Sequence, residues 1–416
     1  MRVEEWKGWR AATIALVAVW IALIVRLMVA DVWDETNGML AFSAPTPLGP
    51  KLQFVLTQSL GFWRPLPTLL VTVVLHFVRD FDVSWRVLRV VNVALLLGAV
   101  GLLVRAAWEG VAYRTDRTDR TDRSDRNGSG VRGFVLVVAL LFSGSAIITG
   151  GWYANVFDAS ALLLIAVALT LLLRGKDIAA GVVLGAAFFC KESAALAFPF
   201  LFVLFAAGRI TFKQALRAGI PATILGAIYF VIRSKIVPFG SAGDVHGFDR
   251  AQFVPTLLHL GESFWEQTLK SYGVWGFVFL AISLVALRRV RVIGAMLLFL
   301  LATAIIYWGM FGEYQNGVVM HHLNFTGRLF LIPVALFLFL LALERQTVAI
   351  AVLLVPIVYG GVLTYRDHLR FQQTYARIYA RAPVTVHFPT KPLDDTVRGV
   401  KIGNYPGAPL LELEQR

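Results

Sequence analysis

The sequence predicts an all-α polytopic membrane protein, a bundle of about 11 transmembrane helices with a long first external loop that contains juxtamembrane helices. Of its 416 residues, 57% are hydrophobic and 16% are charged, whereas a soluble domain has about 45–50% apolar and about 25% charged residues. The mean hydropathy is +0.69, and long apolar runs recur along the chain. No single water-soluble core can bury this much apolar sequence, which excludes cytosolic enzymes, secreted disulfide scaffolds and nucleic-acid binders.

The formal net charge of the chain is +13. In a membrane protein such an excess typically reflects Lys and Arg in cytoplasmic loops and near anionic lipids. The charge therefore indicates orientation in the membrane rather than a nucleic-acid partner. The only cysteine, Cys190, lies in an apolar run, so an intrachain disulfide is excluded.

The first predicted span is Ala11–Ala30, in which Arg26 is the only charged residue. Its length of about 20 residues suits a retained anchor rather than a secretory signal, whose apolar region is shorter. Arg2, Lys7 and Arg10 precede it and place the N-terminus in the cytoplasm. The other predicted spans are Val87–Trp108, Gly133–Gly150, Asp158–Leu173, Asp177–Cys190, Ser193–Ala207, Ala218–Ile236, Tyr272–Leu287, Val292–Phe311, Leu329–Leu343 and Val348–Leu363.

The segment Pro65–Val78 can be another span or a helix folded against the outer surface. As a span it would place the basic segments Arg105–Arg132 and Arg174–Lys176 outside. As a re-entrant or juxtamembrane helix it leaves them inside, which the positive-inside rule favours. This topology places the C-terminus outside the cell.

The chain divides into a transmembrane domain and an external tail. The transmembrane domain is 1–363 and the tail 364–416; within the domain, 31–85 is the first external loop, 109–132 a disordered cytoplasmic linker and 237–271 a second external loop. The linker contains the repeat Thr115–Arg126, whose alternating charges leave no apolar face to pack. The tail begins with a predicted amphipathic helix, Tyr365–Arg381.

Three acids, Asp31, Asp34 and Glu35, follow the first span directly, at the external edge of the membrane. Ionisable groups at such an edge are costly and are therefore candidates for function. A carboxylate there can serve as a general base, or it can belong to a solvated helix end.

Further charged residues interrupt apolar sequence at the same predicted face. Arg64 lies between aromatic residues and Pro65, where it can hold a phosphate or anchor the helix at the lipid headgroups. Asp158 can cap the next helix or face the first loop as a second carboxylate. Lys191 and Glu192 either mark a span boundary or form a functional pair.

The last external loop carries His321, His322 and Arg328. Adjacent histidines point to different faces of a helix or strand, so they are a poor metal pair, and a contact to phosphate or hydroxyl fits them better. Arg328 can bind a lipid phosphate or anchor the next helix among headgroups. The chain has neither a Walker A motif nor a Gly-x-Ser-x-Gly elbow, which argues against an ATP-driven pump and an α/β-hydrolase.

This order of residues resembles the GT-C class of integral membrane glycosyltransferases, which includes protein O-mannosyltransferases and lipid A aminoarabinose transferases. The resemblance extends from Trp9 to Leu363 and implies a GT-C-like catalytic bundle that uses a polyprenyl-phosphate-linked sugar. It assigns the catalytic carboxylate to Asp34, with Glu35 assisting. The resemblance gives substrate-binding roles to Asp31, Arg64, Asp158, Lys191, Glu192, His321, His322 and Arg328. The class commonly has Arg-Tyr where this chain has Arg328-Leu329, and its second-loop acid is not alone as Asp158 is here.

The resemblance implies inverting transfer of a sugar from a polyprenyl-phosphate donor to a hydroxyl of a glycan, lipid or protein acceptor, on the external face of a bacterial inner membrane. The reaction requires no cofactor; a divalent metal is a possible addition, but the sequence offers no ligand set for one. Membrane lipids are expected partners and nucleic acid is not. The alternative is a multi-span transporter or flippase for a lipid-linked sugar, for which internal repeats and mid-membrane polar residues would be typical.

Overall fold

The computed structural model describes most of the bundle at the level of individual helices. The described residues are 3–27, 47–57, 63–78, 81–118, 128–151, 156–236, 254, 258, 290–311, 331–344, 346–381, 384–385 and 414–415.

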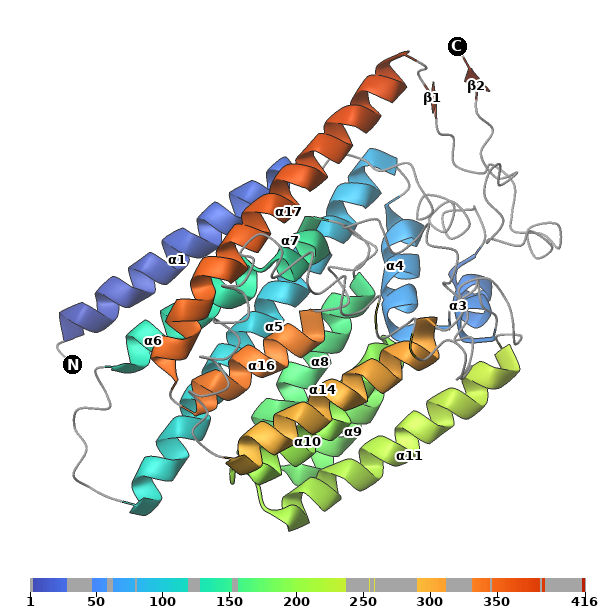
Figure 1. The fold of residues 1–416 in the computed structure, drawn as a ribbon. Coiled ribbons are helices and arrows are strands. Elements are labelled where there is room, and N and C mark those ends of the chain that lie inside the picture. Colours follow the sequence, from blue (N-terminus) through green and yellow to red (C-terminus); the bar gives the residue numbers. More distant parts are fainter. Residues whose placement is uncertain are drawn as a thin grey trace.

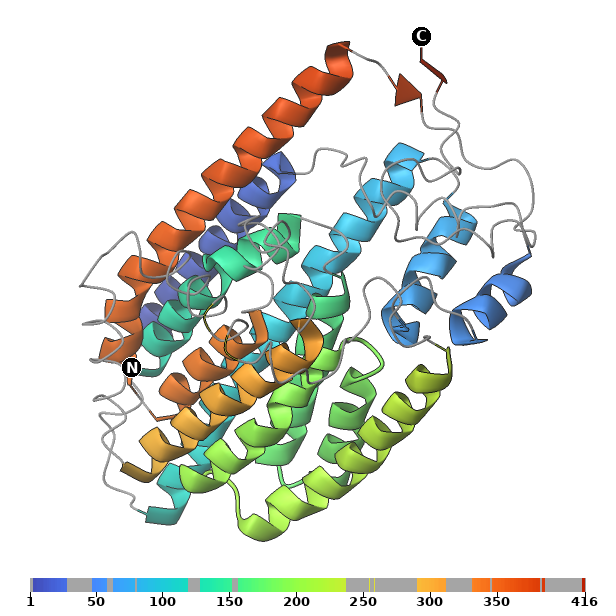
Figure 2. The same ribbon diagram turned by 45° about the vertical axis from the view of Figure 1, so that its right-hand side comes forward.

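Helices make up nearly all of the described chain (Figures 1 and 2). In chain order they are α1 (Val3–Arg26), α3 (Leu48–Thr57), α4 (Pro65–Phe77), α5 (Phe81–Thr118), α6 (Gly128–Leu141), α7 (Gly144–Gly151), α8 (Val156–Leu173), α9 (Asp177–Ala187), the 3₁₀ helix η3 (Glu192–Leu196), α10 (Ala197–Ala206), α11 (Phe212–Ile236), α14 (Val290–Phe311), α16 (Leu331–Leu343) and α17 (Thr347–Arg381). Two short strands, β1 (Val384–Thr385) and β2 (Glu414–Gln415), pair antiparallel near the C-terminus.

Within the described residues, five helices are long and apolar enough to cross a membrane, or six if the bent pair α6–α7 counts as one span. Several other helices are apolar but shorter, among them α4, α9 and α16. Helices satisfy all backbone hydrogen bonds internally, which is what a lipid environment demands. The chain is therefore a helical membrane protein, as its composition predicts, and the number of about 11 spans stays a prediction. The predicted span Tyr272–Leu287 lies outside the described residues.

Two predicted boundaries differ from the structure. Helix α5 continues to Thr118 and α6 begins at Gly128, so much of the predicted linker 109–132 is helical, while 119–127 lie outside the described residues. No proline interrupts α5 between its ends. Helix α17 runs through residue 363 without a break, so the predicted boundary between domain and tail falls inside one helix.

The predicted span Gly133–Gly150 is broken into α6 and α7, which meet at an angle of 61°. The hydroxyl of Ser143 accepts a hydrogen bond from the amide of Ala146 (3.2 Å) and so caps the start of α7. Helix α17 passes very close to this break, because a Cβ atom on Gly361 would lie 2.0 Å from the carbonyl oxygen of Phe142. The bend is therefore built by a local cap and a close helix contact together.

Helices α9 and α11 pack against each other through small residues and run in the same direction. A Cβ atom on Gly181 would lie 2.2 Å from the carbonyl oxygen of Ala218, and one on Gly185 would lie 2.6 Å from the Leu225 Cβ. Gly181 and Gly185 form a Gly-x-x-x-Gly pattern, which allows helix backbones to approach closely in membranes. Helix α11 starts with a capping box between Thr211 and Gln214.

Gly181→Ala is expected to destabilise the protein by about 1–3 kcal/mol, because the new methyl group must push the α11 backbone away. The matched control is Gly219→Ala on α11, where an added Cβ would meet nothing within 4 Å. Reversible unfolding in mixed micelles measures both free energies. An unchanged stability of Gly181→Ala would contradict the close packing of the two helices.

A buried ion pair lies at the end of the bundle where α10 turns into α11. Arg209 donates from Nε to the Glu344 carboxylate (2.9 Å) and also donates to the Leu343 carbonyl at the end of α16. Both side chains of this pair are about 95% buried (5% and 6% exposed). The candidate site lies at the other end of α11, about 30 Å away by the rise of a helix of this length.

Candidate functional site

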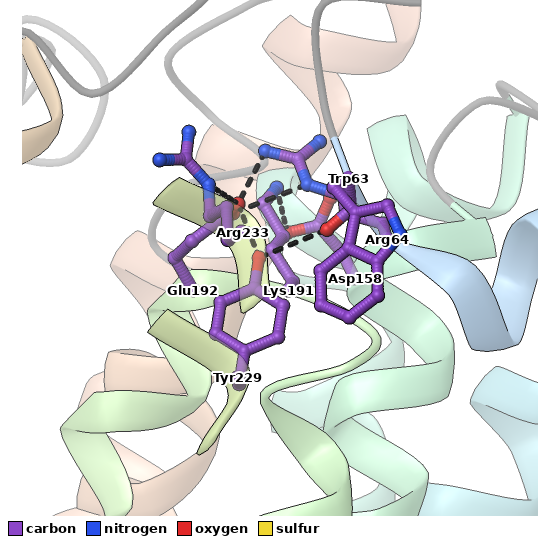
Figure 3. Close-up of polar contacts among 7 residues, drawn as sticks. All are labelled: Trp63, Arg64, Asp158, Lys191, Glu192, Tyr229 and Arg233. Atoms are coloured by element: carbon purple, nitrogen blue, oxygen red, sulfur yellow. Dashed lines mark hydrogen bonds and ion pairs between the residues drawn. The ribbon is translucent and has the colours of Figure 1, made fainter. Parts of the chain in front are cut away.

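Side chains from four segments meet around Glu192 and Lys191 (Figure 3). We call this group the polar cluster. It consists of Arg64 from the start of α4, Asp158 from the first turn of α8, Lys191 and Glu192 from the start of η3, and Tyr229 and Arg233 from the last turns of α11.

Glu192 is 3% exposed and accepts hydrogen bonds on both carboxylate oxygens. Arg64 donates from Nε (3.1 Å) and Nη2 (2.9 Å) to Oε2. The Tyr229 hydroxyl donates to Oε1 (2.8 Å), and Nε of Arg233 lies 3.5 Å from the same oxygen. Two guanidinium groups and a hydroxyl thus stabilise the ionised form of a buried carboxyl group.

Lys191 and Asp158 form a second ion pair beside the first. Their side chains are 4% and 3% exposed, so the pair is almost completely removed from solvent. Asp158 lies in the first turn of α8, where the helix dipole favours a negative charge. The pair connects the start of α8 to the residue that precedes η3.

Local backbone structure brings these side chains together. Helix α9 ends in a tight turn at residues 188–190, and Lys191 then takes an extended conformation that starts η3. The amide of Leu66 donates to the carbonyl of Phe189 (3.2 Å), which ties the first turn of α4 to this same turn. Pro65 occupies the first position of α4, where its missing N–H costs nothing.

Aromatic rings surround the polar cluster. Trp63 stacks on Tyr229 with ring centroids 5.5 Å apart and an interplanar angle of 21°, and Phe189 packs edge-on against both. The Tyr229 hydroxyl lies 3.0 Å from the Trp63 carbonyl, and Arg64 lies over the ring of Phe157. By excluding water, these rings lower the local dielectric constant and strengthen the ion pairs.

The described cluster holds three cations and two carboxylates. Burial lowers the pKa of the Arg64 guanidinium, but the charge and hydrogen bond of Glu192, together with Tyr229 and Asp158, raise it by more, so the pKa lies above its ordinary value and the group stays protonated. A buried cluster with an excess of positive charge suits an anion such as a phosphate, which arginine recognises through several N–H donors. The same contacts also fix α4, α8, η3 and α11 to one another.

Four residues that the sequence singled out form two neighbouring ion pairs, Arg64–Glu192 and Asp158–Lys191. Sequence reasoning missed Tyr229 and Arg233, which lie inside the predicted span Ala218–Ile236. An arginine near the end of an apolar span, one helical turn after a tyrosine, is the pattern that could have indicated them. The remaining predicted site residues, Asp31, Asp34, Glu35, His321, His322 and Arg328, lie outside the described residues.

In the part of the chain that the structure describes, no three His, Cys, Asp or Glu side chains are grouped so that they could hold a metal ion. Comparison of the chain with known protein families, curated proteins and solved structures finds no match.

Proposed function

We propose that this protein is an integral membrane glycosyltransferase of the GT-C type, which moves a sugar from a polyprenyl-phosphate donor to an acceptor hydroxyl. The observation that carries the proposal is the polar cluster, in which Arg64, Lys191 and Arg233 meet two carboxylates at one end of an apolar bundle. Buried ionised groups are costly in a membrane protein and are rare without a functional role. A charged phosphate at the end of a lipid chain is a ligand that such a site can recognise.

In the proposed reaction, the acceptor oxygen forms a bond to the anomeric carbon of the sugar while the bond from that carbon to the phosphate oxygen breaks. The hydroxyl proton passes to Asp34, with Glu35 assisting. The bonding electrons leave with the polyprenyl phosphate, whose charge Arg64 and Lys191 stabilise. This single displacement inverts the anomeric centre. Asp31, His321, His322 and Arg328 are proposed to contact the donor or the acceptor.

The proposed topology has about 11 spans, with the N-terminus in the cytoplasm and the reaction at the external face of a bacterial inner membrane. The acids after the first span and the polar cluster then share one face. The acceptor is a hydroxyl of a glycan, lipid or protein at that face.

A second candidate is a transporter or flippase for a lipid-linked sugar. The broken helix pair α6–α7, with its bend of 61°, favours it. Discontinuous helices often form binding sites in secondary transporters. The two candidates differ in their products, because a flippase leaves the sugar on its lipid carrier.

Deletion of the gene in the source organism, followed by mass analysis of its surface glycans, lipids and glycoproteins, tests the proposal. If the protein is a glycosyltransferase, we expect one hexose or pentose unit to be missing from one acceptor in the deletion strain, and the wild-type gene to restore it. A surface with unchanged glycans in the deletion strain would contradict the proposal. Loss of an entire polymer together with accumulation of its lipid-linked precursor would favour the transporter.

A further inference from the structure

Two polar side chains on α5, Arg89 and Asn92, lie far from water inside the bundle. Both are 0% exposed, although they belong to the apolar segment Arg86–Trp108 that is long enough to span a membrane. Since a buried guanidinium in such a segment is costly, its contacts indicate what it does. Residues three apart on a helix share a face, so Arg89 and Asn92 point in the same direction.

Arg89 caps the end of α1. The amide of Leu27 closes the last turn of α1 by donating to Ile24 (2.9 Å), and its own carbonyl accepts a hydrogen bond from Nη1 of Arg89 (3.2 Å). Carbonyls at a helix C-terminus have no partner inside the helix, and a cation there also complements the helix dipole.

Asn92 acts in the same way on α7. Its side-chain amide donates to the carbonyl of Thr149, in the last turn of α7 (Gly144–Gly151). The two capped helices also touch, because a Cβ atom on Gly150 would lie 2.9 Å from the Trp20 ring of α1. Trp20 and Leu27 are both 0% exposed, so the end of α1 is firmly packed.

The segments that leave these two helix ends carry the acids of the proposed reaction. Asp31 and Asp34 follow Leu27 by four and seven residues, which limits their distance from it to about 14 Å and about 25 Å in an extended chain. Beyond α7, residues 152–155 lead into α8 and Asp158. One face of α5 therefore binds the two helix ends from which the chain continues to Asp31 and Asp34 and to Asp158.

We infer that Arg89 and Asn92 are positioning residues: they bind the C-terminal ends of α1 and α7 and so fix the two points from which the chain continues towards the acids after the first span and towards Asp158. The role of the acids rests on the proposed function. The contacts of Arg89 and Asn92 do not. Removal of either side chain is expected to let the two exits move relative to each other while the far end of the bundle keeps its structure.

The experiment measures distances between pairs of spin labels by double electron–electron resonance in full-length protein in nanodiscs, in a Cys190→Ala background. One pair, at Asn37 and Asn155, reports on the two exits. The second pair, at Lys176 and Val348, reports on the opposite end, where both native side chains are exposed. Arg89→Met and Asn92→Leu are expected to roughly double the width of the first distance distribution and to leave the second unchanged. Arg89→Lys, which can still donate to the Leu27 carbonyl, is expected to restore most of the wild-type width.

The matched control is Arg86→Met, which removes an exposed cation one turn earlier on the same helix and is expected to change neither distribution. Sugar transfer per folded molecule is expected to fall about tenfold to a hundredfold in Arg89→Met and Asn92→Leu, because reacting groups tolerate little misplacement. An unchanged first distribution in a folded Asn92→Leu protein would overturn the inference, as would equal broadening at both ends. If the exits loosen in these variants but the wild-type protein transfers no sugar, the proposed function fails and the positioning contacts stand.

Discussion

Glu192→Gln is expected to lower the free energy of unfolding by about 3–5 kcal/mol, the typical result of removing one partner from a buried ion pair. Glutamine keeps the shape of the side chain but leaves the guanidinium groups of Arg64 and Arg233 without their negative partner. Its side-chain nitrogen would also face one of these cations. Reversible denaturation in mixed micelles measures the change against the wild type.

The matched control is Glu344→Gln, which removes the carboxylate of a well-buried ion pair at the opposite end of α11, with Arg209. A similar loss of stability is expected there, because both pairs are shielded from water to a similar extent. Sugar transfer per folded molecule separates the two variants: Glu192→Gln is expected to lose it, and Glu344→Gln to keep it. If both folded variants transferred sugar at the wild-type rate, the polar cluster would be a structural joint rather than part of a site.

Asp34→Asn is expected to reduce sugar transfer by about 10²–10⁴-fold, the usual contribution of a general base. Asparagine has nearly the same shape as aspartate but cannot accept the proton of the acceptor hydroxyl. The amount of folded protein should not change, since the substitution removes a charge without adding bulk. Transfer is measured as modified acceptor per molecule of enzyme in membranes of the complemented deletion strain.

Two neighbours of Asp34 serve as controls. Glu35→Gln is expected to reduce transfer less than Asp34→Asn, in line with an assisting role, and Thr36→Val to leave it unchanged. Wild-type transfer in Asp34→Asn would rule out Asp34 as the base. A stronger effect of Glu35→Gln would move the base to Glu35.

The helical class of the protein could be predicted from its composition and its long apolar runs, because a helix that crosses lipid needs about 20 mostly apolar residues in a row, about twice as many as a strand. Predicted helix ends also lie close to the observed ends where charged or capping residues stand there. The predicted span Asp158–Leu173, for example, starts two residues after α8 begins and ends at the same residue. The break between α6 and α7 could not be predicted, because the cap of Ser143 acts together with the close approach of Gly361 from a distant helix.

The same contrast applies to the candidate site. Arg64, Lys191 and Glu192 could be singled out because charged residues interrupt apolar sequence there. Arg89 and Arg233 carry the same signal but lie inside segments whose hydropathy still indicates a span. Their partners, the Leu27 carbonyl and the Glu192 carboxylate, are distant in sequence, so only the packing of helices reveals what these arginines hold.

If the protein breaks the bond between a sugar and its lipid phosphate, both products of that cleavage can be followed in vitro. Purified wild-type protein is reconstituted in vesicles with polyprenyl-phosphate-linked sugar and with acceptor, both extracted from the deletion strain. The sugar on the lipid carries a tritium label. Glycosyl transfer predicts that label moves from the lipid to the acceptor as free polyprenyl phosphate appears, and that Asp34→Asn abolishes both changes. Label that stays on the lipid in the presence of wild-type protein, and only changes leaflet, would contradict glycosyl transfer.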